Sequence, residues 1–230
     1  MKHSLYPHLS RGQYIFGLCY LVAQQFLIPY LIVLGARLLR LPMSDLWLNF
    51  AFFCVNFLAI LAVFGKFLYR DLKRMLQNFG SALATCAIGF AVYWAANILV
   101  SLFIALYFPT FQNANDANIS TMAESHYWIM FTGSVVLVPV VEETLFRGVV
   151  FGLGDRFARP LAYALSTLLF AFIHVVGYLG TMTPTELIIS ILQYLPAGLC
   201  LGWAYAKSRT IFVPTLIHTT VNLLGMLAMR

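Results

Sequence analysis

The chain has 230 residues, of which 61% are hydrophobic and only 10% are charged. A soluble domain carries about a quarter charged residues, so this composition excludes an ordinary water-soluble protein and makes lipid the solvent of much of its surface. The net charge of +6 does not indicate nucleic-acid binding, because the basic residues stand in small groups at the ends of apolar runs, as topology signals do.

Apolar runs long enough to cross a bilayer, which takes about 20 residues, follow one another along the chain. The seven runs are Gly12–Ala36, Leu46–Gly65, Phe79–Phe108, Tyr127–Leu153, Leu161–Leu179, Leu187–Ala206 and Ile211–Met229. Splitting the long third run would give an eighth. The polar stretch Pro109–His126, rich in Asn, Asp, Ser and Thr, is typical of an exposed loop. We therefore predict an all-α fold, a polytopic transmembrane helix bundle of about seven spans.

The distribution of Lys and Arg predicts the orientation, because loops rich in these residues stay in the cytoplasm. The predicted loop Lys66–Gln77 carries four basic residues and one acid, whereas Pro109–His126 carries no Lys or Arg. We place the first loop in the cytoplasm and the second outside. Arg37 and Arg40, in the first short loop, depart from this pattern. With seven spans, the prediction is a multi-pass integral membrane protein whose N-terminus is cytoplasmic.

Ionisable residues inside an apolar run mark function by default, because they cost several kcal/mol at membrane depth. Glu142, Glu143 and Arg147 share such a run. The other acids are expected in loops or at helix edges: Asp45, Asp71, Asp116, Glu124, Asp155 and Glu186. Glu143 and Arg147 stand four residues apart, so they share one helix face and can pair. Glu142 is rotated by about 100° from Glu143 and is free to act as a base. A packing network of all three residues is the alternative.

Two histidines and an asparagine fall in other apolar runs. His174 lies in one run, and His218 and Asn222 lie four residues apart in the last. An amide and an imidazole on one helix face are donors suited to a developing oxyanion. At about 1.5 Å per residue, Glu142, His174 and Asn222 each lie roughly 16 to 20 Å from the cytoplasmic end of their helices. By the same estimate His218 lies roughly 10 Å from that end. Three helices therefore bring polar groups to a common layer that would hold a water molecule.

These residues fall in a recognisable order. The run Glu142-Glu143-Thr-Leu-Phe-Arg147-Gly148 resembles the EExxxR signature of the CAAX prenyl protease and bacteriocin-processing family, also called the Abi or type II CAAX prenyl endopeptidase family. Phe170–His174 is similar to the FxxxH element of that family, and His218–Asn222 to its HxxxN element. The resemblance covers roughly Trp128–Leu224, and the first 110 residues match only as hydrophobic spans.

The resemblance implies a glutamate-dependent intramembrane endopeptidase. Glu142 and His174 would activate a water, and His218 and Asn222 would stabilise the oxyanion. Glu143 and Arg147 would support the site. Residues 1–126 would supply N-terminal helices and an external loop, and residues 127–230 a catalytic core, within one membrane domain. The expected location is a bacterial inner or plasma membrane, and the expected partners are membrane lipids and a peptide substrate that enters from the bilayer. The substrate stays open among a prenylated tail, a bacteriocin leader, a C-terminal sorting segment and another membrane peptide.

Three alternatives stand beside this hypothesis. Zinc-dependent hydrolysis is the competing mechanism, since Glu142, His174 and His218 could bind a zinc ion. No HExxH is present and no obvious carboxylate orients either histidine, so we expect no cofactor. A proton-coupled transporter would also bury Glu and His, but the chain shows no inverted repeat. A non-catalytic membrane immunity or adaptor protein would have no reason to retain the full set of polar residues.

Overall fold

The computed structural model describes residues 9–230 and contains helices and no strand within them. The first part consists of α1 (Arg11–Leu38), α2 (Asp45–Gln77) and α3 (Phe79–Tyr107). A continuous helical ribbon follows, made of α4 (Ala114–Phe131), the π-helix η1 (Thr132–Leu137), α5 (Val138–Glu143), the π-helix η2 (Thr144–Phe151) and α6 (Gly152–Gly154). The last elements are α7 (Arg159–Ile173), the 3₁₀ turn η3 (Val176–Tyr178), α8 (Pro184–Ser208) and α9 (Phe212–Ala228).

The predicted all-α membrane bundle is confirmed. In the described part of the chain, five helical segments are long and apolar enough to cross a membrane: Arg11–Leu38, Asp45–Gln77, Phe79–Tyr107, Ala114–Gly154 and Pro184–Ser208. The apolar helices α7 and α9 are shorter. Together these segments match the seven predicted runs, and α3 is one unbroken helix, so the third run does not split into two.

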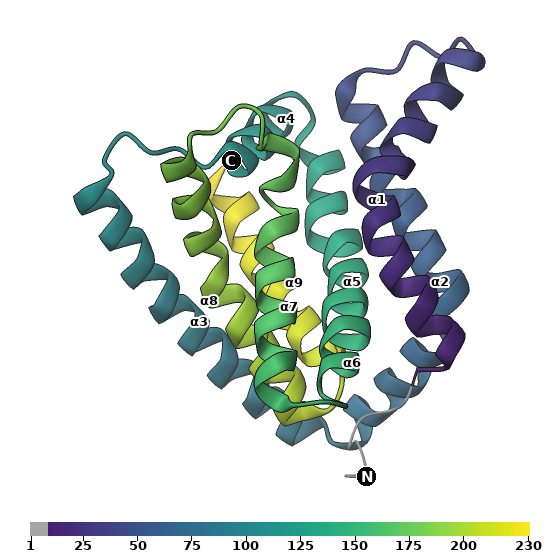
Figure 1. Cartoon of the computed structure of the whole chain (residues 1–230), viewed down its shortest axis with the longest axis vertical. Helices are drawn as coiled ribbons and strands as arrows, with labels where there is room; N and C mark the ends of the chain where they lie inside the picture. The colour runs from purple at the N-terminus through teal and green to yellow at the C-terminus, as the bar shows by residue number, and fades with distance from the viewer. Residues whose placement is uncertain (1–8) are drawn as a thin grey trace.

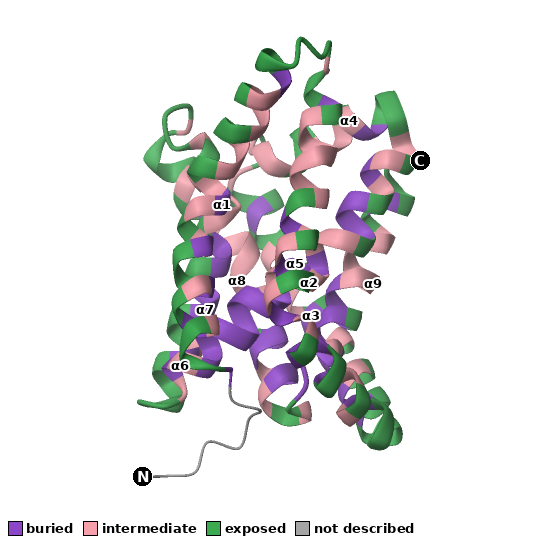
Figure 2. Cartoon of the chain, turned by 90° about the vertical axis from the view of Figure 1, so that its right-hand side faces the viewer, coloured by how far each residue is buried: buried purple, intermediate pink, exposed green. Residues whose placement is uncertain are grey.

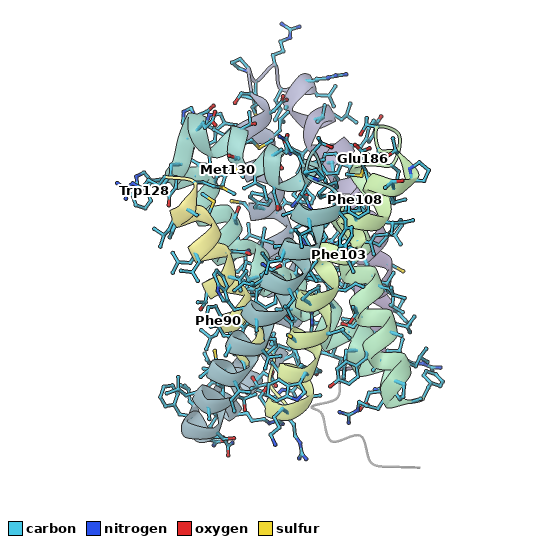
Figure 3. All side chains as sticks on the ribbon, turned by 90° about the vertical axis from the view of Figure 1, so that its left-hand side faces the viewer. Phe90, Phe103, Phe108, Trp128, Met130 and Glu186 are labelled. Atoms are coloured by element: carbon cyan, nitrogen blue, oxygen red, sulfur yellow. The ribbon has the colours of Figure 1, made fainter. Side chains whose placement is uncertain are left out.

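The central helices of the bundle are α5, α7, α8 and α9, with the hairpin of α1 and α2 on one side and α3 on the other (Figure 1). α3 lies against α8 and α9, whereas α1 contacts η2 and α2 contacts α5. Buried residues gather in the central helices toward the end of the bundle at which α1 begins, and the outer helices are largely exposed (Figure 2). Trp128 points away from the bundle (Figure 3), as expected for an aromatic residue at a membrane interface.

The prediction of a loop at Lys66–Gln77 is wrong, because the last turns of α2 occupy this segment. The segment contains no Gly or Pro and consists mostly of good helix formers. Phe67, Leu68 and Met75 are buried, and their spacing is that of one helix face. The basic residues that predicted the orientation therefore project from a helix end.

The prediction of a loop at Pro109–His126 is wrong over most of its length, because α4 begins at Ala114. The side chain of Asn113 accepts hydrogen bonds from the backbone N–H groups of Asn115 and Asp116. Asn and Asp favour the start of a helix as much as a loop, which explains the error. At His126 the backbone leaves the helical region, with φ −149° and ψ 73°, and kinks the helix.

Candidate active site

The helix that carries the two adjacent glutamates changes its winding directly after them. α5 ends at Glu143 and the π-helix η2 begins at Thr144. Such π segments are rare and recur at functional sites. Within η2, Arg147 Nη1 donates to Glu143 Oε1 at 3.1 Å, and both side chains are fully buried. The structure therefore joins the two residues whose spacing indicated a pair.

Arg147 also links the ribbon to two further helices. Its Nη2 donates to the carbonyl oxygen of Gly198 on α8 at 3.3 Å. Its guanidinium carbon lies 4.6 Å from the centre of the Phe170 ring on α7. A buried guanidinium is tolerated when a carboxylate, a carbonyl and an aromatic face surround it. Arg147 thus holds α7 and α8 against the helix that carries the glutamates.

Glu143 has a second partner that lies 75 residues away in the sequence. Nδ1 of His218, on α9, lies 2.9 Å from Glu143 Oε1, the oxygen that also accepts from Arg147. The expectation that no carboxylate orients either histidine is therefore wrong for His218. It failed because the contact depends on how α9 packs against α5, which the spacing within one helix does not reveal.

Glu142 faces both histidine rings. Its Oε2 lies 4.0 Å from Nε2 of His174 and 4.0 Å from Nε2 of His218. This oxygen is buried and has no hydrogen-bond partner among residues 9–230. A gap of this length is too wide for a direct hydrogen bond, while a buried carboxylate oxygen needs a partner. A water molecule between Glu142 and the histidines would satisfy both conditions.

His174 lies at the C-terminal end of α7, whereas the predicted span Leu161–Leu179 put it inside a helix. The helix ends at Ile173, and the chain then turns through η3. Nδ1 of His174 lies 2.8 Å from the carbonyl oxygen of Phe170. Because a carbonyl can only accept, Nδ1 carries the hydrogen, and Nε2 of the neutral ring is an acceptor that faces Glu142.

Asn222 contacts η1. Its Nδ2 donates to the carbonyl oxygen of Ser134 at 2.8 Å, and Thr219 Oγ1 donates to the carbonyl oxygen of Val135 at 3.1 Å. These two bonds hold α9 against the ribbon. A side-chain amide has two N–H groups, so one remains for a further acceptor. The structure thus brings Glu142, Glu143, His174 and His218 together, and it ties Asn222 to the backbone beside them.

A contact of a half-buried tyrosine was missed from the sequence. The Tyr194 ring, on α8, stacks on the His174 ring with centroids 4.2 Å apart and planes 25° apart. The hydroxyl group of Tyr194 lies 3.3 Å from Oδ1 of Asn113. Tyr194 precedes Gly198 by four residues, so both belong to the face of α8 that meets the site. That spacing is the signal that could have found it.

A buried carboxylate lies outside the segment that the motifs indicated. Asp71, predicted in a loop, is fully buried in α2. Its Oδ2 accepts from the backbone N–H of Ile211 at 2.6 Å, and Thr210 Oγ1 donates to its carbonyl oxygen at 3.2 Å. Asp71 therefore fixes the start of α9, the helix that carries His218. Phe67 and Met75, four residues before and after it, are buried too, and this periodicity could have placed Asp71 on a buried face.

The donor set of Glu142, His174 and His218 can be tested against a zinc site. His218 is held by a carboxylate through its second nitrogen, as zinc-binding histidines are. The oxygen-to-nitrogen spacings of 4.0 Å, however, exceed the about 3.4 Å that separates two ligands of a tetrahedral zinc ion. Within residues 9–230, no group of three or more His, Cys, Asp or Glu is arranged to hold a metal ion. The donor types fit zinc, but their spacing fits a bridging water.

Comparisons with known proteins agree with the motifs. Residues 124–224 match the model of the type II CAAX prenyl endopeptidase Rce1-like family. The chain is 30% identical over 90 residues to the UPF0177 protein YxdF of Lactococcus lactis subsp. lactis (strain IL1403), which is 39% of this chain and 44% of that protein. It is 26% identical over 135 residues to the UPF0177 protein YbdJ of the same strain, or 56% of this chain and 54% of that protein.

The chain thus spans about half the length of the curated relatives that it matches. No solved structure matches it. The matched segment includes both glutamates, both buried histidines and Asn222. Over residues 124–224 the chain is therefore similar to the type II CAAX prenyl endopeptidase Rce1-like family.

Proposed function

We propose that the chain is an intramembrane endopeptidase that hydrolyses a peptide bond in a membrane-associated or lipidated peptide. The observation that carries the proposal is the pair of acceptors, Glu142 Oε2 and His174 Nε2, which face each other across 4.0 Å. A species with two O–H groups fits between two acceptors, and water is the smallest. The match of residues 124–224 to the model of an endopeptidase family supports the same conclusion.

The arrangement of hydrogen bonds gives the water its role. Its two hydrogens point to Glu142 and to His174, so an oxygen lone pair is left to attack a carbonyl carbon. As the new C–O bond forms, Glu142 takes a proton from the water. This proton then passes to the leaving nitrogen when the C–N bond breaks, which yields a carboxylic acid and an amine. General-base and general-acid roles of one group in this sequence contribute about 10²- to 10⁴-fold to a rate.

In this proposal His218 stabilises the oxyanion. Its Nδ1–H donates to Glu143 Oε1 at 2.9 Å, so Nε2 carries a hydrogen only when the ring is a cation. The buried cluster supports this form by charge balance: Glu142 and Glu143 are two carboxylates, and Arg147 supplies one positive charge. An imidazolium at His218 makes the cluster neutral, and its Nε2–H would face the developing charge. The free N–H of Asn222 would add a second donor.

The proposed orientation places the N-terminus in the cytoplasm of a bacterial plasma membrane. It rests on the basic residues near the ends of α2, α6 and α8, which the fold brings to the end of the bundle at which α1 begins (Figure 1). Residues 1–8 themselves lie outside the described residues. Labelling of single cysteines at positions 73 and 120 in intact cells tests the orientation, and accessibility of position 73 from outside would reverse it.

Reconstitution of the full chain in proteoliposomes tests the proposed activity. Wild type is expected to cleave members of a library of single-span peptides, with products identified by mass spectrometry. Glu142→Ala and His174→Ala should each abolish the products, while Glu124→Ala, which changes an exposed acid on α4, should leave them unchanged. Cleavage that persists in both active-site variants would contradict the proposal.

Treatment with a chelator distinguishes the metal-free mechanism from the zinc-dependent one. We propose that no metal takes part, so cleavage should survive prolonged treatment with a strong chelator. Loss of cleavage that zinc restores would instead assign Glu142, His174 and His218 as metal ligands.

A further inference from the structure

A pocket of about 510 Å³ opens between the C-terminal end of α3, the connection to α4, and α8. Six of the residues that line it carry the argument: Ile104, Gln112, Asn113, Asp116, Gln193 and Met229. Its wall is mixed, with apolar side chains from α3 and amide groups from the connection and from α8. A pocket of this size holds one or two amino-acid side chains.

This pocket is one side chain away from the proposed catalytic histidine. Asn113 and Asp116 line it, and their Oδ1 atoms lie 3.3 and 3.5 Å from the hydroxyl group of Tyr194. One face of the Tyr194 ring stacks on His174 with ring centroids 4.2 Å apart. Asn113 Nδ2 also donates to Gln193 Oε1 at 2.7 Å. The pocket and the active site are therefore separated by the Tyr194 ring and are held in a fixed relation.

The lining of the pocket has one acidic residue and no basic one. Asp116 is the only ionisable residue of its lining, which has no Lys, Arg or His. Within residues 9–230 no basic side chain forms an ion pair with Asp116. Its side chain is exposed, so it is available to a ligand. A carboxylate beside amide groups favours a cation and repels an anion.

We propose that this pocket binds a Lys or Arg side chain of the substrate peptide, close to the bond that is cut. The inference rests on the proposed function, since it assigns a recognition site to the same catalytic centre. The 4.2 Å stack of Tyr194 on His174, the distance across the Tyr194 ring to its hydroxyl group, and the 3.5 Å from there to Asp116 add up to about 10 Å, which an extended peptide covers in about three residues. The basic residue therefore lies about three positions from the scissile bond.

The same charge excludes one mode of binding. A substrate held in this pocket by its terminal carboxylate would place that group beside Asp116 without any basic side chain from the lining. The peptide segment in the pocket is therefore an internal, basic one, and a free carboxylate terminus would lie elsewhere.

Charge exchange between the enzyme and the peptide tests the proposal. Full-length protein in proteoliposomes is given single-span peptides that differ only in Lys, Ala or Glu at the third position from the cut. Wild type is expected to cleave the Lys peptide about fivefold faster than the Ala peptide, as an exposed ion pair allows. Asp116→Asn should remove the preference, and Asp116→Lys should reverse it in favour of the Glu peptide.

The matched control is Glu124→Lys, which makes the same charge change at an exposed position of the same helix but outside the pocket. It should keep the wild-type preference. An unchanged Lys preference in Asp116→Lys, or equal cleavage of all three peptides by wild type, would overturn the inference while leaving the proposed function intact.

If wild type cleaves no peptide, a binding measurement shows whether the pocket still recognises a basic side chain. It thereby distinguishes failure of the proposed recognition from failure of the proposed activity. In the Glu142→Ala variant, a photoreactive residue at position 112, on the pocket rim, should cross-link the Lys peptide in preference to the Glu peptide. Adding Asp116→Lys should reverse that preference. Equal cross-linking of both peptides would overturn the inference, whatever the result for cleavage.

Discussion

The first three helices and the helices that follow them are similarly apolar, but they bury their residues to different extents. In α1, α2 and α3, 17% of the most apolar window is buried inside the protein, against 50% in the ribbon Ala114–Gly154 and 44% in α8. The outer helices therefore use their apolar residues mainly against lipid. The inner helices use theirs to enclose polar side chains that lipid could not satisfy.

This difference shows that hydropathy locates a span without telling what surrounds it. Glu143 and Arg147 are fully buried among inner helices, where they solvate each other. Asp71 is the exception, since it belongs to an outer helix and is equally buried. Its bond to the start of α9 makes the C-terminal end of α2 part of the support for the site.

The largest effect on stability is expected from Arg147→Ala. The substitution leaves Glu143 buried without its guanidinium partner, which costs about 3–5 kcal/mol. Thermal unfolding of the purified protein in detergent measures it. Arg37→Ala, at an exposed position of α1, should change the free energy of unfolding by less than about 0.5 kcal/mol. Equal losses for both variants would remove the distinction between inner and outer helices.

Two glycines, one on an inner and one on an outer helix, allow the packing of the two kinds of helix to be compared. A Cβ atom at Gly198 on α8 would lie 2.6 Å from Thr167 Cγ2 and 2.9 Å from Thr167 Cα, so α7 and α8 must separate. Gly198→Ala is expected to destabilise the protein by about 1–3 kcal/mol. Gly65→Ala on α2 meets nothing within 4 Å and should stabilise its helix by about 0.5–1 kcal/mol. Changes of the same sign in the two unfolding curves would contradict this account.

A smaller destabilisation is expected from Asp71→Ala, which changes the buried acid of the outer helix α2. The substitution removes the acceptor of the Ile211 N–H group, and loss of such a cap costs about 0.5–2 kcal/mol. Hydrogen exchange should show faster opening of the first turn of α9, while Asp45→Ala, at an exposed position, should leave that turn protected. Unchanged protection in Asp71→Ala would show that α2 does not hold α9.

Much of the fold follows from the sequence, because each span is a local property of about 20 residues. The pairing of Glu143 with Arg147 was likewise predictable, since a spacing of four residues fixes a helix face. The bond from His218 to Glu143 and the stack of Tyr194 on His174 join different helices, so only packing reveals them. The start of α4 at Ala114 was missed because Asn113, which caps it, is as typical of a loop as of a helix start.

The central claim is that Glu142 moves the proton of the attacking water. The most direct test is the single-turnover cleavage rate of Glu142→Gln, which keeps the shape of the side chain but removes its basicity. The account predicts a rate at least about 100-fold below that of wild type, with an unchanged unfolding temperature. Cleavage by Glu142→Gln within a few-fold of the wild-type rate would contradict it.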